Sequence, residues 1–262
     1  MTLEVLICTY GNDGLNRVAK MNLPKVEGVT YLVSLQTEDL NISLPESLNR
    51  TDVRISPTTS KGLSNNRNNS IDNSTGDICL IADDDLSYTP EQLQSVIGVF
   101  EKNQSLDIAL FRHSGNNNKQ YPNYEFDLNT KFPKGYYITS FEIAFRRESL
   151  PTSLRFDSRL GIGSTMPAGE ETLFIHHALK KGLLCRFFPI TIVCHKDLST
   201  GSRIPSPGVI QANGAIIAVR YGLSGLMRLP IIACRLSKQG KAKIFPAVHH
   251  LLKGYIYGKR NF

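Results

Sequence analysis

GDICLIADDDLSYTPEQL, residues 76–93, runs from an apolar segment into three consecutive aspartates and then into a helix start. The segment DICLIA has no polar alternation, so it predicts a strand that is buried on both faces. Thr89, Pro90 and Gln92 stand in the positions of an N-cap, a first helical proline and a capping-box partner, which predicts a helix from residue 90. A buried strand followed by a helix is the repeating unit of an α/β protein.

The segments before this stretch continue the α/β pattern. LEVLICTY (3–10) and VTYLVSLQ (29–36) are too apolar to have a solvent-exposed face, and they predict two more buried strands. The polar loop GNDG and a short helix are expected between them. GLSNNRNNSIDN (62–73) is mostly polar, but it predicts a helix that has Leu63, Arg67, Ser70 and Ile71 on one face.

The later segments are more varied. FPKGYYITSFEIAFRRESL (132–150) predicts strand-rich structure, and EETLFIHHALKKG (170–182) predicts a helix that Gly182 ends. LCRFFPITIVCHKD (184–197) predicts a last strand, and LSTGSRIPSPG (198–208) has the composition of a linker. We therefore expect an α/β fold with a mostly parallel sheet flanked by helices.

Charge divides the chain at about residue 200. The net charge is +7, yet the segment 203–262 holds ten Lys or Arg and no Asp or Glu, which leaves 20 basic and 23 acidic residues elsewhere, a net of −3. We expect a domain over 1–200, with nucleotide-binding and catalytic parts at 1–90 and 91–200, and a basic helical extension over 201–262. A basic extension on a slightly acidic body suggests an anionic partner.

Cysteine usage and the first residues bear on location. The chain has five cysteines, an odd number without metal-ligand spacing, which is typical of reduced, mostly buried thiols. MTLEVLICTYG lacks the basic start and the long apolar run of a signal peptide. We expect a cytoplasmic protein.

The three aspartates need a physical explanation. Two unit negative charges 4 Å apart repel by about 4 kcal/mol at an effective dielectric near 20. A solvated acidic turn that caps a helix would tolerate this arrangement. A divalent cation would remove the repulsion, and Mg²⁺ prefers carboxylates together with substrate phosphates. The position between a buried strand and a capped helix favours the cation, because α/β sheets bind ligands at the carboxyl ends of their strands.

Several motifs in order make the chain similar to the family 2 glycosyltransferases. LICTYGNDGL resembles the first strand and nucleotide-binding loop of that family, and KGLSNNRNNSIDNSTGDICLIADDD resembles its Arg-Asn pair, Gly-Asp, strand and D-x-D motif. GEETLF followed by ALKKGL resembles its Glu-Asp segment on a helix. The resemblance covers residues 3–200 and implies a GT-A fold and an inverting transfer of a sugar from a nucleotide sugar. It also implies Mn²⁺ or Mg²⁺ as the cofactor.

The resemblance implies roles for the acidic run. Asp85 would hold the cation that bridges the donor phosphates, and Asp83 would lie near the ribose or reach the metal through water. Asp84 is either a spacer or a partner in these contacts. Arg67 resembles the arginine that the family directs at the nucleotide, and the alternative is an exposed arginine on a polar helix.

Further nucleotide contacts are expected nearby. Thr9 and Tyr10 could contact the base and ribose, although Tyr10 could equally be a core aromatic residue. Asp39 is a candidate for reading a uracil edge, but it lies a few residues beyond the strand end at which the family places its acid. His195 ends the last strand, where the family often has a histidine near the metal; the alternative is a surface histidine.

Two acids begin the helix at 170–182. At about 100° per residue, Glu171 falls near the centre of the apolar stripe and Glu170 to one side. A carboxylate that faces the protein body at a helix N-terminus stays ionised and suits a general base. We expect Glu171 to take the acceptor proton and Glu170 to bind an acceptor hydroxyl, although the family has Asp where this chain has Glu171. Two acids placed only for the helix dipole are the alternative.

The apolar and basic extension at 201–262 has two possible structural interpretations. It could lie on an anionic membrane surface, which suits a lipid-linked glycan acceptor and a peripheral position at the inner membrane face. It could also be helices packed on the catalytic domain. Nucleic acid is not expected, because no pattern of stacking aromatic residues accompanies the charge.

We therefore expect a metal-dependent transferase that uses a UDP-linked sugar and a glycan hydroxyl, in bacterial surface polysaccharide synthesis. A sugar-nucleotide nucleotidyltransferase is an alternative, although the Gly-rich basic loop that it needs is missing. A non-catalytic nucleotide-sugar-binding protein is another.

Overall fold

The computed structural model describes residues 1–39, 42–115, 119–129, 132–133, 135–195 and 205–262. They form two compact units, each considered by itself. The first comprises residues 1–61, 65–155 and 177–198, and the second comprises 62–64, 156–176 and 199–262. The segment 156–176 thus groups with the basic extension.

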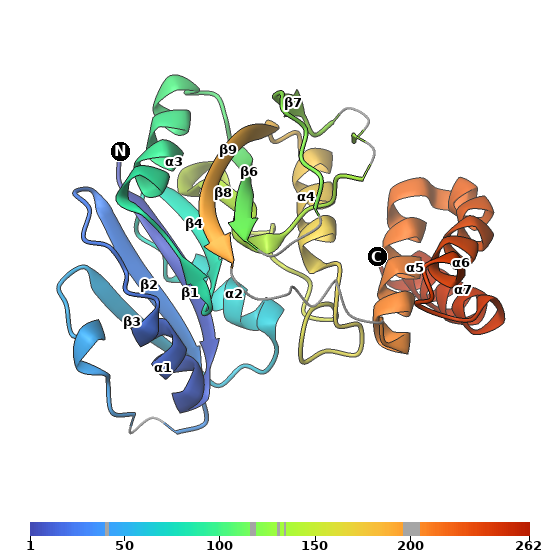
Figure 1. The fold of residues 1–262 in the computed structure, drawn as a ribbon, viewed down its shortest axis with the longest axis horizontal. Coiled ribbons are helices and arrows are strands. Elements are labelled where there is room, and N and C mark those ends of the chain that lie inside the picture. The colour runs from blue at the N-terminus through green and yellow to red at the C-terminus, as the bar shows by residue number, and fades with distance from the viewer. Residues whose placement is uncertain (40–41, 116–118, 130–131, 134, 196–204) are drawn as a thin grey trace. The chain divides into compact units, whose positions relative to one another are not determined.

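The first unit contains a nine-stranded mixed sheet in the order β3-β2-β1-β4-β8-β6-β9-β5, with β7 paired to β9 (Figure 1). The strands are β1 Leu3–Tyr10, β2 Val29–Gln36, β3 Val53–Thr58, β4 Ile78–Asp83, β5 Leu86–Ser87, β6 Ile108–Gly115, β7 Phe126–Asp127, β8 Ile143–Arg146 and β9 Cys185–His195. The run β3-β2-β1-β4 is parallel, as is the β6–β9 pair, whereas β8, β5 and β7 pair antiparallel with their neighbours. The predicted α/β fold class is confirmed. The sheet is mostly parallel only among β3, β2, β1 and β4, and it is mixed beyond β4.

The α-helices are α1 Gly11–Lys20, α2 Leu63–Asp72, α3 Pro90–Lys102, α4 Glu170–Lys180, α5 Pro207–Tyr221, α6 Arg228–Lys238 and α7 Ile244–Asn261. Short 3₁₀ turns are η1 Glu46–Leu48, η2 Ser140–Glu142, η3 Arg147–Ser149 and η5 Gly222–Met227. The capping box at Thr89 and Gln92 is present and begins α3, as predicted. GNDG is not a loop but the first turn of α1. Within 132–150, strand structure is confined to the four residues of β8 among the described residues.

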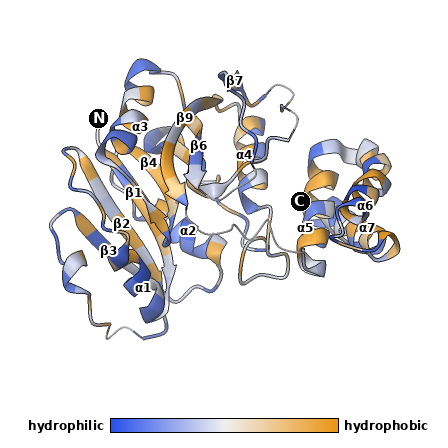
Figure 2. Ribbon diagram, in the orientation of Figure 1, coloured by the Kyte–Doolittle hydropathy of each residue, from blue (hydrophilic) through white to orange (hydrophobic). Residues whose placement is uncertain are grey.

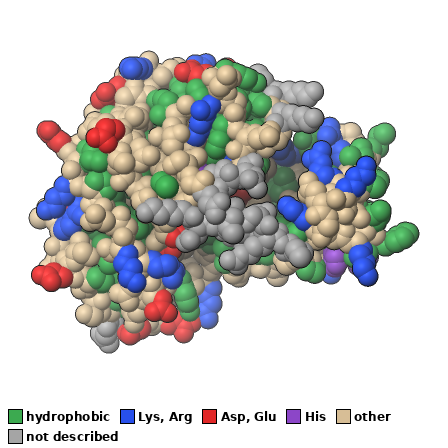
Figure 3. Space-filling model, in the orientation of Figure 1, with side chains coloured by type: hydrophobic (Ala, Val, Ile, Leu, Met, Phe, Trp, Pro, Cys, Tyr) green, Lys and Arg blue, Asp and Glu red, His purple; other side chains and the backbone are tan. Residues whose placement is uncertain are grey.

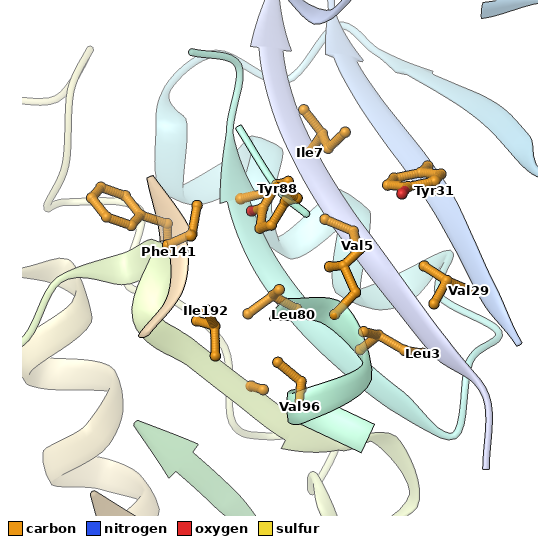
Figure 4. Packing of buried hydrophobic residues seen from close by; sticks show 14 of the residues in the cluster. Leu3, Val5, Ile7, Val29, Tyr31, Leu80, Tyr88, Val96, Phe141 and Ile192 are labelled. Atoms are coloured by element: carbon orange, nitrogen blue, oxygen red, sulfur yellow. The ribbon is translucent and has the colours of Figure 1, made fainter. Parts of the chain in front are cut away.

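Both faces of the parallel strands are covered, which explains their apolar sequences. Side chains alternate along a strand, so Leu3, Val5 and Ile7 of β1 point to the face on which α1 and α3 pack, where they form one core with β2 and β4 (Figure 4). On the other face, Cys8 contacts Ser70 of α2, with its Sγ 3.8 Å from the Ser70 hydroxyl. Figure 2 shows the hydrophobic strands between less hydrophobic helices.

The second unit has its own core, which α5, α6 and α7 form around Leu229, Ala233, Leu251 and Tyr255. Helices α5 and α7 approach closely at glycines. A Cβ on Gly254 would lie 1.8 Å from the Gln211 carbonyl oxygen, and one on Gly214 would lie 2.1 Å from that of Leu251. The extension is therefore a packed helical unit, as expected from its helical spacing.

Candidate functional site

The carboxyl ends of β1, β2 and β4 lie level at one edge of the sheet. Cys8 of β1 pairs with Asp83 of β4, and Tyr10 pairs with Gln36 of β2. The start of α1 and the acidic run at the end of β4 therefore leave the sheet side by side. This edge is where parallel sheets bind ligands.

Asp84 is held by the end of β1 and by α1. Its carboxylate accepts hydrogen bonds from the Thr9 hydroxyl at 2.5 Å and from Arg17 Nε and Nη2 at 3.0 and 2.8 Å. Gly14 leaves the necessary room, because a Cβ there would lie 2.1 Å from Thr9 Oγ1. Asp84 is therefore not a mere spacer: it joins the acidic run to α1. No sequence signal singled out Arg17 or Gly14.

Arg67 is buried, with 2% of its side chain exposed, so the alternative of an exposed arginine is wrong. Its Nη2 donates to Asp83 Oδ1 at 3.0 Å and to Ser140 Oγ at 2.7 Å. Burial raises the pKa of Asp83, and Arg67 opposes that rise. Helix α2 thus places a cation directly beside the first aspartate, while 31% of the Asp83 side chain stays exposed.

The asparagines of α2 form a polar network on the sheet. Asn66 Nδ2 donates to the Thr9 carbonyl at 2.8 Å, and Asn66 Oδ1 accepts from Ser34 Oγ at 2.5 Å. Asn69 Nδ2 donates to Ser34 Oγ at 2.7 Å and to Ser56 Oγ at 3.1 Å. A buried polar group costs free energy unless it is hydrogen-bonded, and these groups satisfy one another. The Asn-rich helix is therefore a support for the site.

Asp85, which directly precedes β5, pairs with His195, the last residue of β9. Leu86 of β5 pairs with His195 of β9, and this register brings His195 Nε2 within 3.2 Å of Asp85 Oδ2. Gly115, with φ of +121°, faces His195 across the sheet, and a Cβ there would lie 1.8 Å from the His195 carbonyl oxygen. His195 is only 9% exposed at its side chain, against 37% for Asp85, so it is not a freely exposed surface histidine.

The donor set fits a cation that brings ligands of its own. No three His, Cys, Asp or Glu side chains among the described residues converge to hold a metal ion by themselves. Mg²⁺, however, usually takes one or two carboxylates and completes its shell with water and substrate phosphates. Asp85 and His195 supply one oxygen and one nitrogen donor, while Asp83 is paired with Arg67. These residues fit a cation bound together with a diphosphate.

Tyr10 and Asp39 lie at the same end of the sheet. Tyr10 ends β1 with 68% of its surface exposed, so it is not a core aromatic residue. Asp39 is also exposed, three residues beyond the end of β2, and its backbone N–H donates to Thr37 Oγ1 at 3.1 Å. Both side chains are accessible to a ligand.

Glu170 and Glu171 lie in the second unit, at the start of α4. Their burial is the reverse of the helical-wheel prediction: Glu170 is 6% exposed, and Glu171 is partly exposed. The first turn of a helix is covered by the loop before it, which periodicity does not describe. Gly161 of that loop leaves room for Glu170, since a Cβ there would lie 3.3 Å from Glu170 Cδ.

A buried ionic cluster beside His195 was not found from the sequence. Glu142 accepts from Lys119 Nζ at 2.5 Å and from the Tyr121 hydroxyl, and it lies 2.6 Å from His113 Nδ1. The His113 ring lies edge-on to the His195 ring, with 6.4 Å between the two ring centres. The four residues of this cluster lie between 113 and 142 without a regular spacing, so no local pattern joins them.

The model of glycosyl transferase family 2 matches residues 38–166, a range that contains Arg67 and the acidic run 83–85. No curated protein sequence matches the chain. The fold is similar to that of S. aureus TarS 1–349 in complex with UDP, with a TM-score of 0.59, 16% identity, and coverage of 98% of this chain and 92% of that one.

A second similar structure is the mannosyltransferase PcManGT from Pyrobaculum calidifontis in complex with GDP-Man and Mn²⁺. Its TM-score is 0.59 at 13% identity, covering 98% of this chain and 86% of that one. The resemblance to family 2 glycosyltransferases and the GT-A-like fold are confirmed. The family match and the fold indicate that this chain is a glycosyltransferase.

Proposed function

We propose that the protein transfers a sugar from a UDP-linked donor to a hydroxyl of a glycan acceptor, with Mn²⁺ or Mg²⁺ and with inversion at the anomeric carbon. The observation that carries this proposal is the set of charges at the sheet edge, in which Arg67 pairs with Asp83 and His195 with Asp85. A mannosyltransferase of similar fold binds GDP-Man and Mn²⁺, and TarS of similar fold binds UDP.

Each residue at the edge has a proposed part in donor binding. Asp85 and His195 would hold the cation, and a cation bound there would supply Lewis-acid stabilisation of the charge on the diphosphate leaving group. Arg67 favours the ionised form of Asp83 against the effect of burial and fixes the direction of its carboxylate, so that Asp83 can accept a hydrogen bond from a ribose hydroxyl. Tyr10 offers an exposed ring to the base, and Asp39 offers a carboxylate to a uracil edge. The hydrogen bond between Thr9 and Asp84 fixes the acidic run against the end of β1.

In the transfer step, the acceptor oxygen bonds to the anomeric carbon as the bond from that carbon to the diphosphate oxygen breaks. We propose that Glu171 accepts the hydroxyl proton. Its partial exposure suits contact with an acceptor better than the burial of Glu170 does. Glu170 then supports the preceding loop. A glycan or lipid-linked glycan acceptor would place the enzyme in bacterial surface polysaccharide synthesis, at the cytoplasmic face of the membrane.

The test measures release of UDP from UDP-sugars with Mn²⁺, with Mg²⁺ and with a chelator. Asp85→Ala should lower the rate by about a hundredfold or more, because a metal contributes several kcal/mol to the transition state. Asp13→Ala is the matched control, since Asp13 is an exposed acid on α1. Full activity of Asp85→Ala in the presence of a chelator would overturn the metal-dependent reaction.

Glu171→Gln separates catalysis from binding. It should lower transfer to an acceptor by roughly 10²–10⁴-fold and leave the thermal stabilisation by UDP and Mn²⁺ unchanged. If the chain bound the donor and Glu171→Gln changed no measured rate, the assignment of the base would be wrong.

A further inference from the structure

The exposed apolar side chains of the described residues are concentrated in the second unit. Of the fifteen large hydrophobic residues that are exposed, nine lie between Tyr221 and Ile256. The most exposed of these nine are Phe245 at 89%, Met227 at 78%, Leu223 at 75% and Ile231 at 64%. Patches of this kind on soluble proteins mark interaction surfaces.

The helices that carry these exposed side chains already bury other apolar residues in a core of their own. Helix α6 packs through Leu229 and Ala233, and α7 packs through Ala247, Leu251 and Tyr255, which are all buried. Helix α6 therefore has a buried stripe at 229 and 233. The exposed stripe begins with Met227, the last residue of η5, and continues with Ile231 of α6. The two stripes lie on different sides of the helix because four residues make about one turn.

The exposed stripe of α7 is also apolar. Phe245, Leu252 and Ile256 are spaced at i, i+7 and i+11, which places them on one face, and they are 89%, 41% and 43% exposed. Lys253, Lys259 and Arg260 are exposed beside this face. Each helix thus pairs a packed face with a water-exposed apolar stripe and basic side chains.

Basic residues continue the exposed stripe of α6. Arg235 and Lys238 follow Ile231 at i+4 and i+7, and the exposed Lys243 precedes α7. Between residues 203 and 262 the chain has no Asp or Glu, so these cations find no acidic side chain within the segment. Arg220 and Arg228 lie over the Tyr221 ring, at 5.5 and 3.9 Å from its centre. In Figure 3, Lys, Arg and hydrophobic side chains are interspersed on the visible surface of this unit.

The stretch Pro207–Lys238 is long and apolar enough to cross a membrane, with a mean hydropathy of 1.4 over its best window. Its structure does not suit a span. Gly222, with φ of +53°, ends α5 after fifteen residues, and η5 separates α5 from α6. A helix of that length covers about 22 Å, against the roughly 30 Å of a bilayer core. The geometry favours a unit that lies on a membrane.

We infer that the exposed stripes of η5, α6 and α7 form a docking surface for an anionic lipid membrane, with Met227, Ile231 and Phe245 entering the lipid and the cations contacting phosphate headgroups. Charge selects this occupant. Lys and Arg extend their charged ends to the headgroups while their stems stay in the apolar layer. A second copy would bring two uniformly positive surfaces together, which like-charge repulsion opposes. The inference rests on the proposed function only in that a lipid-linked acceptor would be presented at this surface.

The experiment is flotation of the 262-residue chain with vesicles of phosphatidylcholine alone and of phosphatidylcholine mixed with phosphatidylglycerol. We expect binding to the mixed vesicles, weakened by high salt. Phe245→Ser combined with Met227→Ser should weaken binding at least roughly tenfold. Replacing Arg235, Lys238 and Lys243 by Gln should weaken it roughly a hundredfold. Leu44→Ser and Lys102→Gln change an exposed apolar and an exposed basic residue of the first unit and should leave binding unchanged.

Absence of binding to the mixed vesicles would overturn the inference, as would equal binding by all variants. Dimerisation that Phe245→Ser abolishes, measured by light scattering, would show a second copy on this surface and would also overturn it. The vesicle assay contains no nucleotide, and thermal stabilisation by UDP and Mn²⁺ is measured on the same variants. Failure of lipid binding and failure of donor binding are therefore recorded separately.

Discussion

Two groups of charged residues in the first unit have similar chemistry and opposite access to water. At the sheet edge, the side chains of Asp83 and Asp85 are 31% and 37% exposed. In the cluster beside it, the side chains of Glu142 and Lys119 are fully buried and contact each other at 2.5 Å. The charges of the buried pair compensate each other, whereas the edge aspartates retain capacity for a ligand. Exposure distinguishes a binding site from a structural ion pair.

The sharpest test of this comparison is Glu142→Ala. Removing one partner of a buried ion pair leaves Lys119 uncompensated, so we expect a loss of about 3–5 kcal/mol of unfolding free energy. The matched control is Glu148→Ala, which changes an exposed acid in η3. It should lower the unfolding free energy by less than about 0.5 kcal/mol. Urea unfolding measures both, and equal stability of the two variants would contradict the structural role of Glu142.

Arg67→Met tests the ion pair that joins the buried Arg67 to Asp83 at the sheet edge. The loss of a buried hydrogen-bonded cation should cost about 1–3 kcal/mol. The pKa of Asp83 is raised by burial, and Arg67 opposes this, so the variant should raise that pKa further. When a carboxyl group has a higher pKa in the folded than in the unfolded state, the protein loses unfolding free energy as the pH rises from the unfolded-state pKa to the folded-state pKa.

The destabilisation by Arg67→Met should therefore grow from acid to neutral pH. Unfolding curves of the natural chain and the variant at several pH values measure this growth. A pH-independent difference between them would show that Arg67 acts by packing and not through the charge of Asp83.

Arg17→Ala should have a smaller effect. Half of the Arg17 side chain is exposed, and exposed ion pairs contribute only about 0–1 kcal/mol. Loss of this contact should loosen Asp84 and lower donor affinity more than stability. Lys20→Ala, on the same helix, is the matched control, and thermal shift with UDP and Mn²⁺ measures both. Unchanged donor binding by Arg17→Ala would remove Asp84 and Arg17 from the site.

Thiol labelling gives the smallest expected change. Burial raises the pKa of Cys8 to about 12, and Cys79 and Cys185 are also raised to about 12. The thiolate is the reactive form, so these three should resist a thiol reagent at neutral pH. Cys234 is exposed and should react in the native protein without loss of structure. Rapid labelling of Cys8, followed by mass spectrometry, would mean that the edge opens readily.

Local patterns in the sequence determined much of the first half of the fold. The apolar runs at 3–10 and 29–36 became β1 and β2, and the capping box at Thr89 began α3. These predictions succeeded because a strand covered on both faces and a capped helix are both specified by adjacent residues. The same argument placed the acidic run at the carboxyl end of β4.

Tertiary structure alone decided which charged residues meet. The pairs Arg67–Asp83, Arg17–Asp84 and His195–Asp85 join residues 16, 67 and 110 positions apart. Strand register sets these contacts, and so does room left by glycines such as Gly14 and Gly115, which no local pattern reveals. The order of burial of Glu170 and Glu171 was likewise set by the loop at Gly161, because the first turn of a helix is covered by what precedes it and not by its own periodicity.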